Sequence, residues 1–137
     1  MRSHKGFSLV ELLLVVVIVG LIATVSIPSL NRARDAADNA AAMAKLRNIH
    51  TSQSNFRFQF FRYARLPELN KFAEGAHGTV VGSTLRYKDF TFLMFPNPTD
   101  ASLRSGFQVI GYRVRDGRVI SQYNMTQDGD IRTIIQR

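Results

Sequence analysis

Glu11 is the single charged residue in a mostly apolar stretch that runs over residues 7–27. About 20 apolar residues are enough to cross a bilayer as a helix. Inside such a helix an ionised carboxylate costs roughly 2.5–3.5 kcal/mol, and by default it marks a functional site with a charged partner. We therefore expect Glu11 to form an ion pair. The alternative is a simple membrane anchor whose carboxylate reaches up to the lipid headgroups.

The remaining titratable residues do not form a catalytic or metal-binding pattern. His4, His50 and His77 are scattered, and no two of them have metal-ligand spacing. No serine lies in a nucleophile-elbow motif. The segment Asp128-Gly129-Asp130 resembles part of a calcium loop but lacks the further carboxylates of a full oxygen shell, so a plain turn is the preferred interpretation. The expectation is a protein that is not an enzyme and holds no metal or cofactor.

The residues around the start of the apolar stretch match a known pattern. The segment Lys5-Gly6-Phe7-Ser8-Leu9-Val10-Glu11 resembles the processing site of type IV prepilins and of the related type II secretion pseudopilins. In that family a short basic leader ends in Gly, an aromatic residue or Met follows, and Glu is the fifth residue of the mature chain. Glu11 is fifth counting from Phe7, and Pro28 falls where the family commonly has Pro. The resemblance covers about the first 30 residues, since the motif ends there.

This resemblance implies a maturation pathway. A prepilin peptidase would cut between Gly6 and Phe7 and methylate the new Phe7 amine, with S-adenosylmethionine as donor. That amine would supply the cation for Glu11, in the same subunit or in a neighbour, and would favour one axial register of docking. Arg2 and Lys5 precede the apolar run and no positive charge follows until Arg32, which places the N-terminus in the cytoplasm.

The residues after the apolar stretch predict that the helix continues. Residues 31–63 contain no Gly or Pro and are rich in Ala, so a helix over 7–63 would be about 85 Å long. A stripe of larger apolar residues should face a small domain; it comprises Leu46, Ile49, Phe56, Phe60 and Tyr63. Phe58 and Phe61 lie off this stripe. Gly20 and Pro28 weaken the helix between them, so this stretch either extends on assembly or keeps a mild permanent kink.

The C-terminal part predicts an antiparallel sheet. Asp116-Gly117 is a two-residue hairpin turn between strands over 107–115 and 118–125, and Ile131–Gln136 is a third strand. The turn predicts a register with pairs Val114–Val119, Tyr112–Ser121 and Ile110–Tyr123, and an outer face with Arg113, Gln122 and Asn124. Residues 90–95 are a further candidate strand. Leu66-Pro67 ends the long helix, and Gly75, Gly78 and Gly82 mark a flexible loop.

Together these elements predict an α+β chain with four parts. They are a prepilin leader (1–6), a transmembrane and assembly half of the helix (7–30), an amphipathic half (31–65) and a globular head (66–137) with a three-stranded antiparallel sheet. The chain has no cysteine, unlike the many pilins that close a distal loop with a disulfide, so packing and hydrogen bonds must hold the head. Asp35, Asp38, Glu68 and Glu74 are candidate acidic partners for the basic residues of the helix.

The expected function is that of a structural subunit of a type IV pilus-like filament. The chain would wait in the inner membrane as a single-pass protein and then join a helical homo-oligomer, outside the cell or across the periplasm. Its partners would be the prepilin peptidase, an inner-membrane assembly platform and the membrane. The net charge of +8, or +6 without Arg2 and Lys5, makes DNA or another polyanion a further candidate partner. The alternatives are a type II secretion pseudopilin and a signal-anchored periplasmic binding protein.

Overall fold

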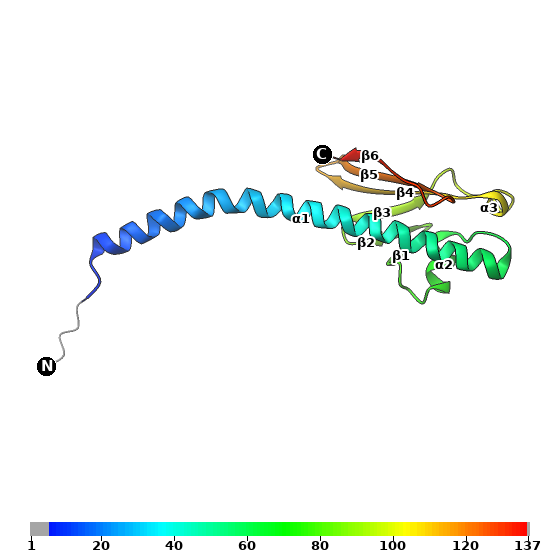
Figure 1. The fold of residues 1–137 in the computed structure, drawn as a ribbon, viewed down its shortest axis with the longest axis horizontal. Helices are drawn as coiled ribbons and strands as arrows, with labels where there is room; N and C mark the ends of the chain where they lie inside the picture. Colours follow the sequence, from blue (N-terminus) through cyan, green and yellow to red (C-terminus); the bar gives the residue numbers. More distant parts are fainter. Residues whose placement is uncertain (1–5, 137) are drawn as a thin grey trace. The chain divides into compact units, whose positions relative to one another are not determined.

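The computed structural model describes residues 6–136, and the chain divides into two compact units, residues 1–37 and 38–137. Helix α1 (Leu9–Phe60) supplies the regular structure of the first unit and continues into the second (Figure 1). Apart from Gly6, the leader predicted over residues 1–6 lies outside the described residues. The long helix followed by a small antiparallel sheet confirms the predicted α+β class.

The second unit contains six strands: the three predicted at the C-terminus, the candidate strand near residues 90–95, and two short strands before it that were not predicted. They follow one another in the sheet in chain order, each antiparallel to its neighbours. The strands are β1 (Thr79–Val81), β2 (Thr84–Tyr87), β3 (Phe90–Met94), β4 (Gln108–Arg115), β5 (Arg118–Thr126) and β6 (Ile131–Gln136). The short helices are α2 (Leu66–Phe72) and α3 (Ser102–Ser105). In the predicted Gly-rich loop, Gly82 instead forms a tight turn between β1 and β2, with φ of 60°.

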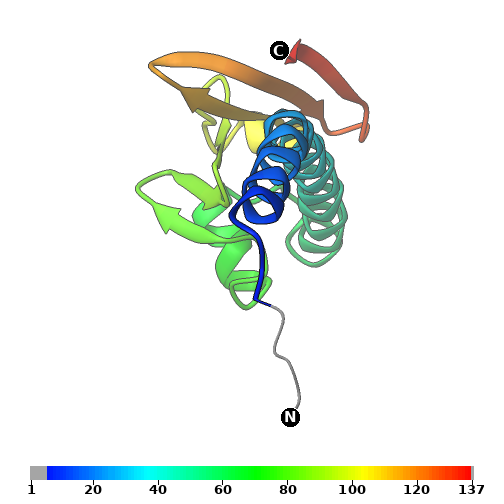
Figure 2. The same cartoon turned by 90° about the vertical axis from the view of Figure 1, so that its left-hand side faces the viewer.

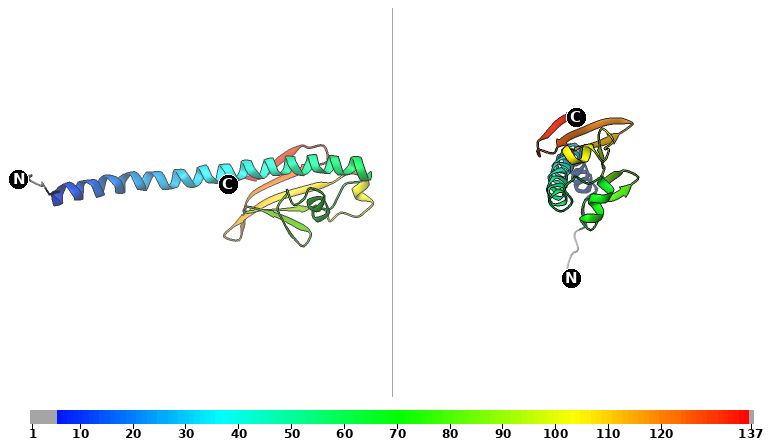
Figure 3. Two further views of the ribbon diagram at one scale, coloured as in Figure 1. Left: turned by 90° about the horizontal axis from the view of Figure 1, so that it is seen from below. Right: turned by 90° about the vertical axis from the view of Figure 1, so that its right-hand side faces the viewer.

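The hydrophobic core of the second unit lies between α1 and the sheet (Figures 2 and 3). Leu46, Ile49 and Phe56 are buried, as the apolar stripe predicted. Their partners on the other elements are Leu66, Leu69, Leu85, Phe90, Phe92, Leu103, Val109, Tyr123 and Met125. Each large apolar side chain that is fully buried contributes roughly 1.5–3 kcal/mol, so this contact holds a cysteine-free domain together.

Helix α1 ends three residues earlier than the periodicity predicted. Phe61 has a left-handed backbone, with φ of 56°, which stops the helix at Phe60. Tyr63 is still buried, but it belongs to the chain that leaves the helix, and Phe60 is 52% exposed. The gap in the stripe between Ile49 and Phe56 is filled by Gln53. Its amide accepts from the Ala64 N–H at 2.9 Å and donates to the Ala64 carbonyl at 2.8 Å.

The predicted hairpin register is correct only next to the turn. Val114 pairs with Val119, but a bulge then moves the pairing by one residue, so that Arg113 lies opposite Ser121. The buried face of β4 therefore carries Val109, Gly111 and Arg113, and the prediction of Arg113 on the outer face was wrong. A one-residue change of register sends every side chain to the opposite face of a strand, which is why a single bulge has so large an effect.

Candidate assembly site

The predicted processing junction lies directly before the first turn of α1. Gly6, Phe7 and Ser8 are not helical, and the Ser8 carbonyl accepts from the N–H groups of Glu11 and Leu12, both at 3.1 Å. Glu11 lies in the first helical turn, where the positive end of the helix dipole favours a carboxylate. An amine created at Phe7 would therefore arise beside the turn that carries Glu11, and both side chains are exposed.

The first unit presents an apolar surface. Among the side chains that the structure describes, its large apolar helix residues from Leu9 to Leu30 are between 48% and 78% exposed. An 18-residue window of α1 has a mean hydropathy of 2.8 and is long and apolar enough to cross a membrane. Soluble monomers rarely expose continuous apolar surfaces of this size, which usually mark contacts with lipid or protein.

Gly20 and Pro28 both lie inside the continuous helix. A Cβ added to Gly20 would meet nothing within 4 Å, so no close contact within the chain requires a glycine there. The Thr24 hydroxyl donates to the Gly20 carbonyl at 2.8 Å. Pro28 has no N–H to donate to the carbonyl of Thr24, so this turn lacks one backbone hydrogen bond. The extension of this stretch on assembly stays a prediction.

Arg113 is the centre of a buried polar network that the sequence did not reveal. Its side chain is 2% exposed, and Nη2 donates to Asn39 Oδ1 at 3.2 Å. Ser121 donates to the same oxygen at 3.0 Å. Arg113 Nη1 lies 4.0 Å from an oxygen of Asp38, whose other oxygen is 2.7 Å from Lys88 Nζ. The network fastens α1 to the sheet, so Asp38 has cationic partners within its own chain.

A second set of polar contacts fastens the loop after α2 to α1. His77 is 2% exposed, and its Nε2 lies 2.9 Å from Ser52 Oγ. Its backbone N–H donates to Asn70 Oδ1 at 3.0 Å. Next to it, Lys45 Nζ donates to the Ala76 carbonyl at 2.9 Å and lies 4.1 Å from the centre of the Tyr87 ring. His77 is therefore a buried part of this contact and not a surface residue.

We expect the contacts of His77 with Ser52 and Asn70 to weaken at acidic pH. Burial, with a smaller contribution from Lys45, lowers the pKa of His77 below its ordinary value of 6.5. Within the described residues Nδ1 is buried without a hydrogen-bond partner, so an imidazolium would bury an unpaired N–H. The unfolded chain then binds a proton more readily than the folded one. The contribution of His77 to stability is complete above pH 6.5 and declines as the pH falls below it.

The measurement is urea unfolding of the detergent-solubilised chain between about pH 7.5 and pH 5. His77→Gln should flatten the decline in the unfolding midpoint. The matched control is His50→Gln, because His50 also makes a ring hydrogen bond, at 3.0 Å to the Gln127 carbonyl. A decline that is as steep in His77→Gln as in the unaltered chain would contradict the assignment.

The architecture and the start of α1 together define the class of chain. A long N-terminal helix followed by a small antiparallel sheet is a pilin-like α+β fold. Residues 1–27 match the family model described as the prokaryotic N-terminal methylation motif. The chain thus carries a prepilin-type motif, and Gly6, Phe7 and Glu11 lie within the matched segment.

A relative in Myxococcus xanthus (strain DK1622) is described as type IV major pilin protein PilA. It is 31% identical over 61 residues, which cover 44% of this chain and 28% of that protein. The matched part of this chain thus spans little more than a quarter of the relative's length. The motif and this relative support a subunit of the pilin or pseudopilin type. The motif and the long apolar helix fit anchoring in a membrane before assembly.

Proposed function

We propose that this protein is a structural, non-catalytic subunit of a type IV pilus-like filament. The observation that carries the proposal is the exposed apolar surface of α1 with Glu11 in its first turn, directly after the Gly6–Phe7 junction. In the membrane this surface contacts lipid. In a filament the same surface packs against other copies of the chain.

The proposed assembly step pairs two opposite charges. A prepilin peptidase cuts after Gly6 and methylates Phe7, and the resulting ammonium group neutralises Glu11 of a neighbouring subunit as that subunit leaves the membrane. A lone buried charge is strongly unfavourable, whereas a well-placed pair is tolerated, so the correct axial register is favoured over others. An inner-membrane assembly platform with a separate ATPase would supply the energy for extraction.

The four-part division of the chain belongs to this proposal. Residues 1–6 are the leader, 7–30 the membrane and assembly segment, 31–65 the amphipathic half of the helix and 66–137 the head. Before assembly the chain is a single-pass inner-membrane protein with a cytoplasmic N-terminus, and afterwards it is part of an extracellular pilus. A periplasm-spanning pseudopilus is the related alternative, because the motif is common to both classes.

Mass spectrometry of sheared surface fibres tests this function. We expect abundant chains that begin at N-methylated Phe7. Processed chains that remain in the cell envelope, with no surface fibres, would favour the pseudopilin. Assembled chains that still carry Met1 to Gly6 would exclude the ion-pair mechanism, because no amine would exist at Phe7.

A further inference from the structure

We propose that a hollow at one end of the sheet in the second unit binds a neutral saccharide. This inference goes beyond the role in a filament. The hollow has a volume of about 250 Å³ and lies where β3 ends, β4 begins and β5 ends, next to α3. Ligand sites are concave and mostly apolar, with a few polar groups that orient the ligand, and sites for drug-sized ligands measure about 300–1,000 Å³. This smaller hollow suits a single sugar ring.

The lining combines apolar rings with neutral polar groups. The Phe95 side chain is 59% exposed, and its N–H donates to the Gln108 carbonyl at 3.2 Å. The rings of Pro96 and Pro98 and the amides of Gln108 and Gln127 also line the hollow. A pyranose has C–H groups on its faces and hydroxyl groups around its edge. Apolar rings can pack against those faces, and amides can both donate to and accept from those hydroxyls.

The amides of the lining are available to a ligand. In the described part of the chain, neither the Gln108 nor the Gln127 side chain has a hydrogen-bond partner. The backbone of Gln127 is held in place, because its carbonyl lies 3.0 Å from His50 Nε2. Its side chain lies against Gly106, where an added Cβ would be 2.9 Å from Gln127 Oε1. The glycine therefore leaves room for this amide at the hollow.

The charge of the lining selects a neutral ligand. The chain has 18 Lys and Arg residues and a net charge of +8, yet the described residues that line the hollow are all uncharged. Sites for a phosphate or a carboxylate usually place an arginine or a lysine against the anion. In so basic a chain, an uncharged lining therefore favours a ligand without charge.

The position of the hollow in the sheet favours a compact ligand over an extended peptide. Peptides that bind a sheet commonly add a strand to an open edge. Strands β3, β4 and β5 are inner strands, each paired on both sides, so the hollow offers no open edge. A sugar ring needs no backbone pairing and fits this position.

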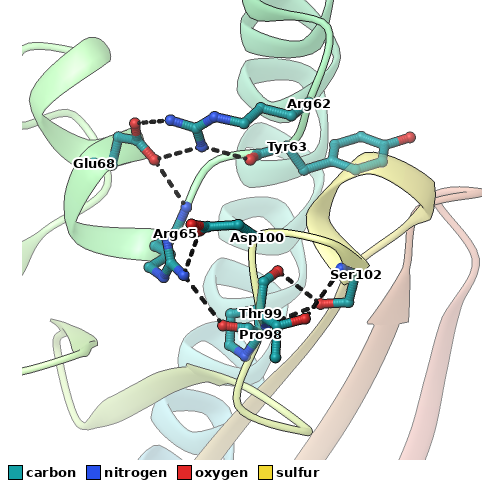
Figure 4. Close-up of polar contacts among 8 residues, drawn as sticks. All are labelled: Arg62, Tyr63, Arg65, Glu68, Pro98, Thr99, Asp100 and Ser102. Atoms are coloured by element: carbon teal, nitrogen blue, oxygen red, sulfur yellow. Dashed lines mark hydrogen bonds and ion pairs between the residues drawn. The ribbon is translucent and has the colours of Figure 1, made fainter.

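The loop between β3 and α3, which forms one rim of the hollow, is fixed by polar contacts (Figure 4). Arg65 forms an ion pair with Asp100 at 2.7 Å and donates to the Pro98 carbonyl at 3.4 Å. The Ser102 hydroxyl donates to the Thr99 carbonyl at 2.9 Å and accepts from the Thr99 N–H at 3.0 Å. A rim that is already ordered loses little freedom when a ligand binds, which favours binding.

The test is saturation-transfer NMR of the full chain in a detergent without a sugar headgroup. The probes are the methyl glycosides of glucose, galactose, mannose, N-acetylglucosamine and N-acetylgalactosamine, with a sialic acid glycoside as the charged comparison. At least one neutral glycoside should bind, and the sialic acid glycoside should not bind more tightly. Titration of each glycoside gives its dissociation constant. Binding of none of the neutral glycosides would overturn the site.

Three variants locate the binding. Phe95→Ala should weaken it about tenfold, because one aromatic contact is lost. Gln127→Ala should weaken it by about 2- to 12-fold, the effect of one lost hydrogen bond. Gly106→Ala removes no polar group but displaces the Gln127 amide, so it should weaken binding to a similar extent. Its fold is preserved, because Gly106 has an extended backbone, with φ of −175°, and only the end of a flexible side chain must move.

The matched controls are Phe58→Ala and Gln59→Ala, which remove exposed side chains of the same types outside the hollow. Neither should change the affinity. Equal losses in control and site variants, or tighter binding of the sialic acid glycoside than of every neutral one, would overturn the site. Unchanged glycoside binding with loss of self-association in Phe95→Ala would also overturn it, in favour of a contact between copies. Glu11→Gln should still bind the glycoside, so failure of filament assembly and failure of this site are distinguishable.

Discussion

Filaments should be lost when Glu11 is replaced by Gln or Val, while membrane insertion stays normal. Both variants remove the negative charge, and neither makes the apolar helix harder to insert, because an ionised carboxylate is the least favourable group there. In the proposed mechanism the incoming subunit then has nothing to pair with the methylated amine of its neighbour. Electron microscopy of surface fibres and fractionation of membranes measure the two outcomes separately.

Two controls make this experiment specific. Glu11→Asp keeps the charge on a shorter side chain, so it should retain some filaments. Thr24→Val changes a polar residue of the same helix that donates to the Gly20 carbonyl, and it should assemble normally. If Glu11→Gln formed fibres in normal number, the carboxylate would belong to the membrane anchor and would have no role in assembly.

Replacing Arg113 by Ala should destabilise the second unit by about 1–3 kcal/mol, the usual effect of removing one partner from a buried hydrogen-bonded network. The change leaves Asn39 Oδ1 with only the Ser121 hydroxyl and leaves Asp38 without one of its two cations. It also opens space beside the Phe90 ring, whose centre lies 5.3 Å from the guanidinium carbon. Whole domains are stable by only about 5–15 kcal/mol, so the urea midpoint should fall steeply.

The comparison variants separate the polar effect from the lost volume. Arg113→Met fills most of the space without hydrogen bonds, so it should fall between Ala and the unaltered chain. Arg118→Ala removes an exposed arginine next to the same hairpin turn and should change stability by less than about 0.5 kcal/mol. An Arg113→Ala midpoint equal to that of Arg118→Ala would show that the network does not stabilise the fold.

The long helix and the motif at its start were readable because each has a strong local signal. A continuous apolar run, an Ala-rich stretch and one carboxylate at fixed spacing do not depend on distant residues. The stripe of Leu46, Ile49 and Phe56 also follows from helix periodicity alone, and the structure confirms it. The Asp116-Gly117 turn was likewise correct, because its chemistry is local.

The errors arose where tertiary contacts decide. The bulge in the hairpin has no signature in the residues next to it, yet it turns Arg113 inward, where Asn39 from a distant helix is its partner. Gln53 looked like an interruption of the apolar stripe because its partner is backbone 11 residues away. Strand β1 has only three residues, all exposed, so it shows no alternation by which a strand could be recognised.

The position of the Arg113 network has a mechanical consequence. Asp38 and Asn39 are the first residues of α1 in the second unit, and both lie in that network. If a filament is put under tension, the load that travels along α1 reaches these bonds before it reaches the apolar contacts at Leu46 and beyond. A chain without disulfides would then rely on these bonds, and on the packed side chains behind them, to resist pulling.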